Sequence, residues 1–481
     1  MGSDWIDCEL GDLIELKRGY DLPKTKRVNG GVPVVSSSGS SGEHNEIKVK
    51  APGVVTGRYG TIGEVFYIED DFWPLNTTLY VKDFKGNDPL YVYYFLKTIR
   101  YSDYTDKGAV PGINRNHIHR AKVKVPVDPL HQRNLALKLF DLDKKIQLNK
   151  QTNQTLEKMA QALFKSWFVD FDPVFDNLLA SADFKLENLE TSLPDELIQK
   201  AQRRLTALNS LHNATQCKAS LSALAHELQA QLPTKEATQA AEKGTETPVK
   251  ANFNANPTIL AQHANTHAHF PNEFEHNEQL GWIPKGWSAD NLSIIAKFTS
   301  ERVNGDDLTF DNYISTDNMR ANRGGITKAS KIPEVKTTPG FRPGHILISN
   351  IRPYFKKIWL ATSSGGRSND VLGFEALEPK NTGYLFNLLF QDAFFDYMMT
   401  TSKGSKMPRG DKKAIMDWMI VIPPDHIQEN YSMLVKEFYK ATSLRSKEID
   451  TLTELRDTLL PKLISGELQI PDTATVEEIV D

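Results

Sequence analysis

The sequence predicts an α+β protein made of two β-rich globular modules in tandem, each followed by one long helix. Three observations support this prediction. Segments of the sequence recur 296 residues apart, short β-type runs separated by glycine and proline fill the first part of each copy, and apolar heptads fill the second part.

Length and composition favour a soluble protein of two or three domains. The chain has 481 residues, of which 25% are charged and 40% hydrophobic. Cys8 and Cys217 are far apart and lack C-x-x-C companions, so we expect a reducing cytoplasm and no zinc ribbon. The N-terminal residues do not resemble a signal peptide, and no apolar run approaches the ~18 residues of a membrane span. We therefore expect no membrane partner.

The net charge of −4 hides an uneven distribution. Residues 1–131 are neutral, 132–280 carry −3, 281–428 carry +4 (19 basic against 15 acidic residues) and 429–481 carry −5. Positive charge therefore gathers on a predicted globular part, as contact with phosphate groups requires.

The internal repeat is the most informative feature of the sequence. DKGAVPGINRN (106–116) recurs as SKGSKMPRGDKK (402–413), and VKVPVDPLHQ (123–132) recurs as WMIVIPPDHIQ (418–428). The same offset takes Leu156 to Leu452. We infer a tandem duplication whose copies diverged most in their first parts.

Each first part predicts several strands and one short helix. The expected strand regions are 31–37, 53–68 and 72–81 in the first copy and 344–351 and 355–362 in the second, and the expected helices are 88–100 and 383–399. Within the first copy, TGRYGTIGEV (56–65) could suggest a phosphate-binding loop. Its G-x-x-G-x-x-G spacing fits no nucleotide motif, and β-type runs flank it, so we expect a hairpin turn.

The second part of each copy predicts a helix of 30 to 40 residues, about 45–60 Å long. The expected seams are Leu135, Leu139, Leu142, Ile146, Asn149, Asn153, Leu156, Ala160 and Leu163, and Tyr431, Val435, Phe438, Thr442, Ile449, Leu452, Leu455 and Leu459. Packing on the helix's own module would explain the amphipathicity but not the length, so we expect the two helices to pair as a coiled coil. Asn149 and Asn153 in one seam, and Thr442 and Arg445 in the other, would fix the register.

The segment between the copies predicts helices at 193–232 and a polar, flexible stretch at 233–260. His263, His267, His269 and His276 have no neighbouring cysteine, so we interpret them as solvated loop residues rather than metal ligands. The predicted boundaries are a module at 1–130, a long helix at 131–170, a partly helical, flexible linker at 171–280, a module at 281–426, a long helix at 427–468 and a tail at 469–481.

Motifs for catalysis are missing. The string Ile422-Pro423-Pro424-Asp425 lacks the residues of a DNA methyltransferase loop, and Asp425 is more simply a helix cap. There is no H-E-x-x-H, G-x-S-x-G or nucleotide loop. The chain is therefore predicted to be a binding or organising subunit, with no catalytic residue and with neither metal nor cofactor of its own.

Basic loops interleaved with aromatic and amide side chains occur at matching places in both copies, and this pattern favours DNA binding over solvated surface charge. The candidate DNA-binding residues are Lys17, Arg18, Tyr20, Arg58, Tyr59, Asn114, Arg115 and Asn116 in the first copy, and Arg352, Tyr354, Lys356, Lys403, Lys406, Arg409, Lys412 and Lys413 in the second. Because glycine and proline interrupt residues 403–413, we expect those charges to lie on a loop.

Several long stretches resemble the specificity subunit of type I restriction–modification systems. They are GDLIELKRGYDLP (11–23), APGVVTGRYGTIGEVFYI (51–68), FWPLNTTLYV (72–81), LFKSWFVDFDPV (163–174), GWIPKGW (281–287), ILISNIRPYFKKIW (346–359) and SKGSKMPRGDKKAI (402–415). The resemblance runs from near residue 4 to about 470, and the linker at about 180–275 is longer than expected.

The resemblance implies that the modules are two target recognition domains, each reading one half of a split sequence in double-stranded DNA. The long helices would run antiparallel with pseudo-twofold symmetry and set the number of unread base pairs. Two adenine-N6 methyltransferase subunits and restriction subunits would dock, bringing S-adenosylmethionine, ATP and magnesium, in the cytoplasm of a bacterium or archaeon at the nucleoid. The alternatives are a catalytic restriction–modification polypeptide, the specificity part of another restriction–modification class and a coiled-coil adaptor that binds no DNA.

Overall fold

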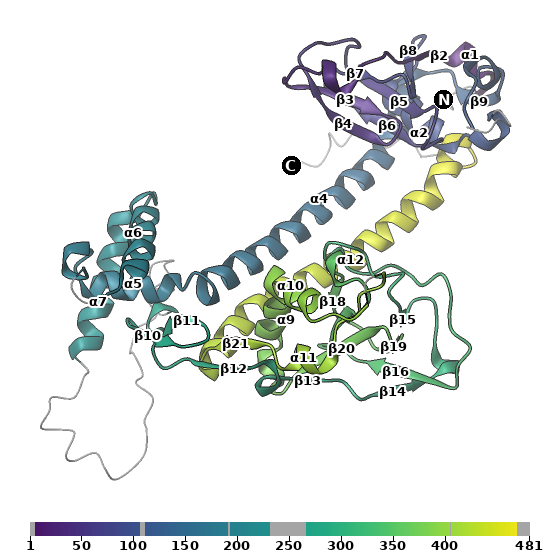
Figure 1. Cartoon of the computed structure of the whole chain (residues 1–481). Helices are drawn as coiled ribbons and strands as arrows, with labels where there is room; N and C mark the ends of the chain where they lie inside the picture. The colour runs from purple at the N-terminus through teal and green to yellow at the C-terminus, as the bar shows by residue number, and fades with distance from the viewer. Residues whose placement is uncertain (1–4, 106–110, 191–192, 231–265, 405, 469–481) are drawn as a thin grey trace, which may run out of the picture. The chain divides into compact units, whose positions relative to one another are not determined.

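The computed structural model describes residues 5–105, 111–190, 193–230, 266–404 and 406–468 (Figure 1). It contains two compact units: unit 1 comprises 1–153 and 444–481, and unit 2 comprises 154–443. In the described part of the chain, no helix combines the length and apolar character needed to cross a membrane.

Unit 1 is built on a four-stranded antiparallel sheet. The strand order is β2 (Glu15–Arg18), β8 (Thr78–Asp83), β5 (Gly53–Gly57) and β6 (Val65–Ile68). Valines suit the pleated surface of β5, which is buried along its whole length. Helix α2 (Pro89–Thr98) packs on this sheet, and its first turn is capped by Asp88, which accepts a hydrogen bond from the backbone N–H of Tyr91 at 2.9 Å.

A smaller sheet and a separate strand pair complete unit 1. The sheet has the order β4 (Gly39–His44), β3 (Val32–Ser36) and β7 (Trp73–Pro74), with β3 parallel to β7. Strand β1 (Trp5–Glu9) pairs antiparallel with β9 (Lys122–Pro126), and the short helices are α1 (Leu10–Leu13) and α3 (Arg115–Ile118). The ring of His119, which follows α3, accepts a hydrogen bond at Nε2 from the backbone N–H of Leu16 (3.0 Å), and burial lowers the pKa of His119.

Unit 2 repeats the four-stranded sheet and the separate strand pair of unit 1, and it differs in its remaining strands. Its four-stranded antiparallel sheet has the order β13 (Ala296–Phe298), β20 (Val371–Ala376), β17 (Ile346–Ser349) and β18 (Ile358–Leu360). Strand β12 (Ser288–Asn291) pairs with β21 (Met419–Ile422) as β1 pairs with β9. The remaining strands are β14 (Arg302–Asn304), β16 (Thr337–Phe341), β19 (Gly365–Arg367) and β15 (Tyr313–Ile314) in one sheet, and β10 (Phe274–Asn277) and β11 (Gly281–Pro284) in another.

The single helix predicted at 383–399 is wrong, because the chain forms two helices, α9 (Thr382–Phe390) and α10 (Asp392–Thr400). Gln391 between them is extended, with φ −66° and ψ 152°. Its amide Nε2 donates to the side chain of Gln161 (2.8 Å) and to the backbone carbonyl of Asn387 (2.9 Å). The break is fixed by a contact with a residue 230 positions away, which helical periodicity cannot reveal.

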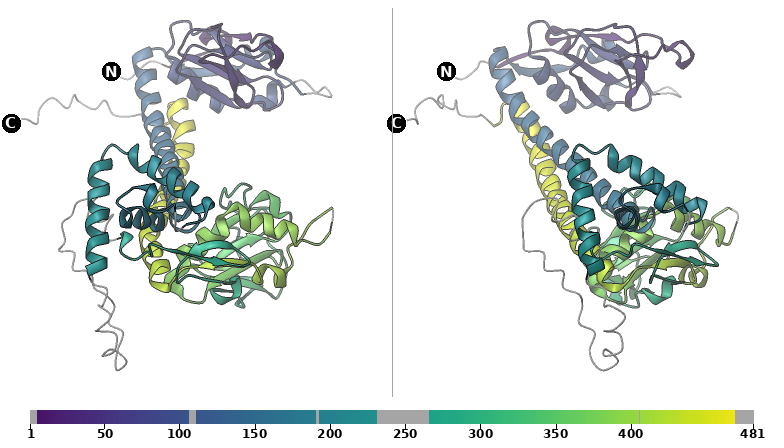
Figure 2. Two further views of the ribbon diagram at one scale, coloured as in Figure 1. Left: turned by 60° about the vertical axis from the view of Figure 1, so that its left-hand side comes forward. Right: turned by 90° about the vertical axis from the view of Figure 1, so that its left-hand side faces the viewer.

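The two longest helices are α4 (Pro129–Phe168) and α12 (Asp425–Ser465) (Figures 1 and 2). In unit 1 their segments pair antiparallel, since Asn149 Nδ2 donates to Glu448 (2.9 Å) and Asn153 Nδ2 donates to Ser446 (3.3 Å). The predicted polar seam positions of α4 therefore meet α12. One predicted seam residue of α12 is wrong, because Leu455 is 44% exposed.

A third polar contact in unit 1 ties this helix pair to the globular part. The carboxylate of Asp143 accepts hydrogen bonds from Arg456 Nη1 and from the hydroxyl of Tyr94, both at 2.7 Å. Burial and the neighbouring carboxylate raise the pKa of Tyr94. One carboxylate thus joins α4, α12 and α2.

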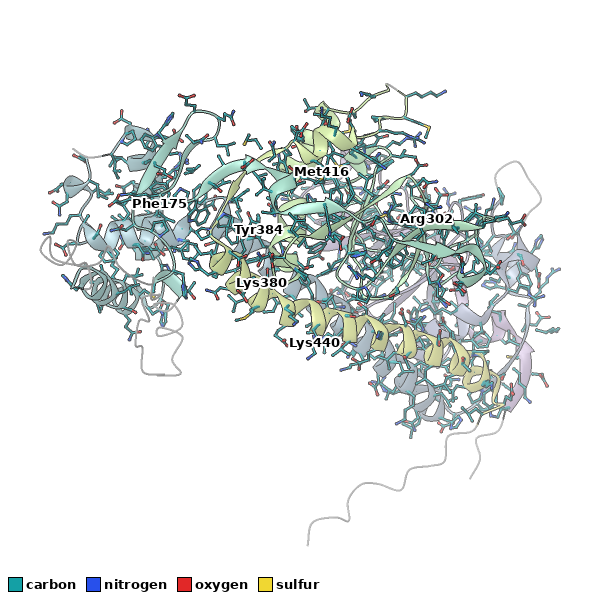
Figure 3. The ribbon with its side chains drawn as sticks, turned by 90° about the horizontal axis from the view of Figure 1, so that it is seen from below. Phe175, Arg302, Lys380, Tyr384, Met416 and Lys440 are labelled. Carbon is teal, nitrogen blue, oxygen red and sulfur yellow. The ribbon has the colours of Figure 1, made fainter. Side chains whose placement is uncertain are left out.

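In unit 2, the two helices also meet, and a salt bridge holds the start of α12. The hydroxyl of Tyr431 donates to the backbone carbonyl of Ala160 at 2.9 Å. Lys380 Nζ pairs with Asp425 (2.5 Å) and Glu429 (2.9 Å). Figure 3 shows Lys380 beside α12. Asp425 is the first residue of α12 rather than the residue before it, so it lies one position past the predicted cap.

In its described residues, the segment between the copies contains the helices α5 (Asp172–Ser181), α6 (Asp195–Asn209) and α7 (Ala214–Ala230), which pack on one another (Figure 2). The prediction of helices at 193–232 is confirmed for 195–209 and 214–230, while 231–260 lies outside the described residues. Phe171, Phe175 and Leu197 from this segment share one apolar core with Trp287 of the second module.

A buried charged network closes this helical group, and it corrects the interpretation of one histidine. Asp176, fully buried, accepts two hydrogen bonds from Arg204 (both 2.7 Å) and contacts His267 Nε2 at 2.9 Å. Burial acts to raise the pKa of Asp176, but these hydrogen bonds outweigh it and hold the pKa below its usual range. His267 is 4% exposed, so its assignment as a solvated loop residue is wrong; its partner lies 91 positions earlier in the sequence.

His269 and His276 are exposed, and His263 lies outside the described residues. In the regions that the structure covers, no three His, Cys, Asp or Glu side chains are grouped so that they could hold a metal ion.

Candidate nucleic-acid interface

In unit 1, the glycine-rich stretch forms the predicted turn between β5 and β6, which pair from Gly53↔Ile68 to Thr56↔Val65. The backbone N–H groups of Arg58 and Tyr59 both donate to the carbonyl of Thr77, at 2.9 and 3.2 Å. A Cβ atom on Gly57 would lie 1.9 Å from the carbonyl oxygen of Thr61, so only glycine fits there. The hairpin prediction is confirmed, and the turn is fixed by its backbone.

A second loop lies beside this turn. The backbone N–H of Ile113 donates to the carbonyl of Arg58 (3.0 Å), and Tyr59 forms an isolated bridge with Gly112. A Cβ on Gly112 would lie 2.2 Å from the ring of Tyr59. The guanidinium of Arg58 lies over the ring of Tyr59, 4.5 Å from its centroid. This contact orders the charge without neutralising it.

The residues after this second loop begin helix α3. Asn114 is its N-cap, and its side-chain oxygen accepts a hydrogen bond from the backbone N–H of Asn116 at 3.0 Å. Arg115 and Asn116 are exposed in the first turn. Asn114 therefore has a structural role, while Arg115 and Asn116 remain candidate DNA-binding residues.

The three candidates in β2 and just after it, Lys17, Arg18 and Tyr20, differ from one another. Tyr20 is half-buried, and its hydroxyl lies 3.0 Å from that of Tyr80; this hydrogen bond lowers the pKa of Tyr20. Lys17 Nζ lies 3.5 Å from the hydroxyl of Tyr20. Arg18 is exposed, and its guanidinium lies 3.7 Å from the carboxylate of Asp21. Tyr20 and Lys17 thus form part of a local polar contact at the end of the edge strand β2.

In unit 2, the turn between β17 and β18 occupies the same topological position as the turn between β5 and β6. Its neighbour is again the loop that precedes the last strand. The backbone N–H of Arg352 donates to the carbonyl of Pro408 (2.8 Å), and Ile351 bridges Arg409. The structure thus brings together, in each unit, two segments that the sequence separates by about fifty residues.

The basic side chains on these two loops divide into paired and unpaired groups. Ion pairs join Lys356 to Asp392 (2.7 Å), Lys403 to Asp411 (2.5 Å) and Arg409 to Asp370 (3.1 Å). All three are at the surface, where such pairs exchange readily for other partners. In the described part of unit 2, the exposed candidates without an acidic partner are Lys406, Lys412 and Lys413.

The prediction that residues 403–413 form only a loop is wrong at its end, because Lys412 and Lys413 begin helix α11 (Lys412–Met416). Asp411 caps this helix by accepting hydrogen bonds from the backbone N–H groups of Lys413 (3.0 Å) and Ala414 (3.4 Å). The backbone positions that carry Lys412 and Lys413 are therefore fixed.

Aromatic side chains accompany the charges on the β17–β18 turn. Tyr354 and Phe355 are 48% and 37% exposed, and their ring centroids lie 4.6 Å apart. Arg352 has a left-handed backbone (φ 51°), and its Nε is buried without a hydrogen-bond partner. Exposed rings and an unsatisfied guanidinium nitrogen at one turn are typical of a binding surface.

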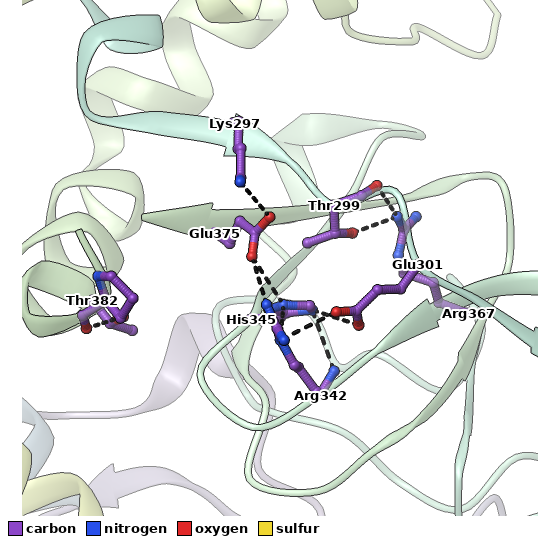
Figure 4. Close-up of polar contacts among 9 residues, drawn as sticks. Lys297, Thr299, Glu301, Arg342, His345, Arg367, Glu375 and Thr382 are labelled. Atoms are coloured by element: carbon purple, nitrogen blue, oxygen red, sulfur yellow. Dashed lines mark hydrogen bonds and ion pairs between the residues drawn. The ribbon is translucent and has the colours of Figure 1, made fainter. Parts of the chain in front are cut away.

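Two other basic side chains of unit 2, Lys297 and Arg342, form ion pairs in a polar network on its central sheet (Figure 4). Glu375 pairs with Lys297 (3.3 Å) and Arg342 (3.1 Å), and Arg342 also pairs with Glu301 (3.2 Å). Burial lowers the pKa of His345, which lies among these groups. Because its charges balance, this network adds little to a binding surface.

Sequence reasoning missed a further basic loop, Arg320–Gly325, which contacts the β17–β18 turn. The backbone N–H groups of Asn322 and Arg323 donate to the carbonyls of Phe355 (2.7 Å) and Lys356 (2.8 Å). The string RANRGG, with two arginines beside two glycines, was the available signal.

Comparison with known proteins points to one class, proteins with a DNA specificity domain. A family model described as "Type I restriction modification DNA specificity domain" matches residues 2–158. The MjaIX type I restriction enzyme specificity subunit of Methanocaldococcus jannaschii is 33% identical over 406 residues, covering 79% of this chain and 69% of that protein. The HindI specificity subunit of Haemophilus influenzae is 24% identical over 375 residues, covering 75% and 72%.

The fold is also similar to that of a solved structure, a type I restriction–modification system S subunit from M. genitalium. The TM-score is 0.52 at 14% identity, with 96% of each chain covered. This chain belongs to the family of type I restriction enzyme specificity subunits. It is a non-catalytic specificity subunit of a restriction–modification system, whose catalytic activities reside in partner subunits.

Proposed function

We propose that this chain recognises a bipartite target in double-stranded DNA, with one half-site read by the module at 1–130 and the other by the module at 281–426. The observation that carries the proposal is the recurrence of one arrangement in both units. In each, the same sheet presents a basic turn beside the loop that precedes the last strand. Loops on a rigid sheet, rich in arginine, lysine and amide groups, suit the edges and phosphates of a duplex.

The long helices are proposed to act as a coiled-coil spacer with pseudo-twofold symmetry, which fixes the number of unread base pairs. Two adenine-N6 methyltransferase subunits would dock on equivalent surfaces of this repeat, and restriction subunits would join them. S-adenosylmethionine, ATP and magnesium would belong to those partners, and the complex would act on DNA in the cytoplasm. The internal repeat and the family support this proposal.

The experiment combines the chain with its methyltransferase subunits and maps N6-methyladenine on DNA treated with the complex. We expect methylation within one split sequence, both halves of which appear in every modified site. A control complex without this chain should leave the same DNA unmodified. Methylation at unsplit or random sites would contradict the bipartite proposal.

A second experiment assigns the half-sites. Arg58→Ala in unit 1 should weaken recognition of one half-site, and Arg409→Ala in unit 2 should weaken recognition of the other. Binding is measured on duplexes in which each half-site is scrambled separately. If both variants affected the same half-site, the assignment of one module to each half would fail.

A further inference from the structure

The loop Arg320–Gly325 in unit 2 stands on a rigid base. Its ends meet through the antiparallel bridge Met319↔Ile326, and Met319 is 1% exposed in a small apolar cluster. Below this bridge, the amide of Asn318 donates to the backbone carbonyls of Tyr313 (3.0 Å) and Thr327 (2.8 Å). The position of the loop is therefore set by buried contacts.

The loop and the β17–β18 turn concentrate unusual backbone conformations. The described chain has eight non-glycine residues with positive φ, and four of them are in these two segments: Asn322 (53°), Arg323 (61°), Arg352 (51°) and Lys356 (50°). Such conformations are unfavourable for side chains other than glycine and persist where surrounding contacts impose them, which is common at ligand-binding sites. The hydrogen bonds from Asn322 to Phe355 and from Arg323 to Lys356 supply those contacts here.

One polar side chain of the loop, Arg323, contacts the rest of unit 2, and two others, Arg320 and Asn322, extend into solvent. Arg323 turns toward the protein: its Nε donates to the backbone carbonyl of Phe390 (2.8 Å), its guanidinium carbon lies 4.9 Å from the centroid of the Phe390 ring, and it pairs with Asp392. Arg320 and Asn322 are exposed, and neither side chain has a hydrogen-bond or ion-pair partner in the part of the chain that the structure describes. A Cβ on Gly324 would lie 2.9 Å from the Cβ of Arg320, so glycine leaves room for the arginine stem.

We propose that Arg320 and Asn322 contact base edges in the half-site recognised by unit 2, and that Arg323 is a positioning residue for this loop; the inference rests on the proposed function. Arginine and asparagine form paired hydrogen bonds to guanine and adenine edges, which require a fixed geometry. A loop held by buried contacts provides that geometry. The lysines at 403–413 carry ammonium point charges and are better suited to phosphate groups, which need charge more than direction.

The test uses the full-length chain, first to select its preferred duplex from a randomised library and then to measure affinities by fluorescence anisotropy. The variants are Arg320→Ala and Asn322→Gly, since glycine tolerates the positive φ of residue 322. Arg203→Ala is the matched control, because it removes an exposed arginine from helix α6. Each loop variant should lose roughly 5- to 150-fold in affinity for the preferred duplex and relax the preference at one base pair of one half-site.

Affinity for unrelated DNA should stay within about twofold for these variants, and the control should match the wild type on both duplexes. Arg323→Lys, which keeps the charge but loses the Nε hydrogen bond, should lower discrimination without changing the salt dependence of binding. Equal losses on preferred and unrelated DNA would mean phosphate contact and would overturn the assignment. If the wild type prefers one sequence and the loop variants bind it with the same affinity and preference, only the assignment of Arg320 and Asn322 is overturned. If the wild type shows no sequence preference, the proposed function is overturned as well.

Discussion

Replacing Arg58 by alanine separates binding from folding in unit 1. The backbone of this turn is held by hydrogen bonds from the N–H groups of Arg58 and Tyr59 to Thr77 and from Ile113 to the carbonyl of Arg58. None of these bonds uses the arginine side chain. The side chain itself makes a cation–π contact with Tyr59, at 4.5 Å from the ring centroid.

The two expected effects of Arg58→Ala differ in size. A cation–π contact at an exposed site stabilises by about 0.5–1 kcal/mol, so the free energy of unfolding should fall by no more than that. A lost contact to a base edge costs about 1–3 kcal/mol of binding free energy, or roughly 5- to 150-fold in Kd. If Arg58 contacts a phosphate instead, the slope of log K against log salt should become shallower by about 0.9.

The assay pairs fluorescence anisotropy, on the preferred duplex at several salt concentrations, with urea unfolding of the same preparations. Arg203→Ala again serves as the control for loss of one exposed arginine. Wild-type affinity and an unchanged salt slope in the Arg58→Ala variant would exclude a contact between Arg58 and DNA. A loss of stability well above about 1 kcal/mol would refute the claim that the turn is held by its backbone alone.

Three further predictions concern one buried and two partly buried polar groups. Asp143→Ala removes the carboxylate partner of Arg456 where α4 meets α12. The free energy of unfolding of unit 1, measured by urea unfolding, should fall by about 1–3 kcal/mol. An unchanged free energy would show that the pair does not stabilise the two helices. Asp176→Ala removes the buried contact of His267 and leaves Arg204 only the partly exposed carboxylate of Asp172 (3.2 Å), so it should cost about 1–3 kcal/mol in unit 2, seen as a lower melting temperature. An unchanged melting temperature would contradict this. Burial lowers the pKa of His119 below its usual value of 6.5, so the neutral ring contributes stability above pH 6.5, and this contribution is lost as the pH falls through the folded pKa. His119→Gln should therefore flatten the dependence of the free energy of unfolding on pH. An identical pH profile in the variant would exclude His119 as the source of that dependence.

The candidate site was only partly accessible from the sequence, and particular residues show why. Arg58 and Tyr59 could be proposed because glycines and flanking valines mark a hairpin locally. Asn114 was proposed as a DNA-reading amide, but its oxygen caps a helix, a use that depends on the backbone geometry of the next two residues. Arg320 was missed because nothing in its own segment shows that it lies beside the β17–β18 turn.

The long helices, the hairpin turn at 56–65, the recurrence of sequence segments and the resemblance to the family could all be recognised in the sequence, because they depend on local patterns and on repetition along one chain. The tertiary structure alone decided which distant segments meet: the two basic loops of each unit, the break at Gln391, and the burial of His267 against Asp176. Contacts of this kind join residues that are far apart in the chain, and their hydrogen bonds form only once packing has brought both partners out of water.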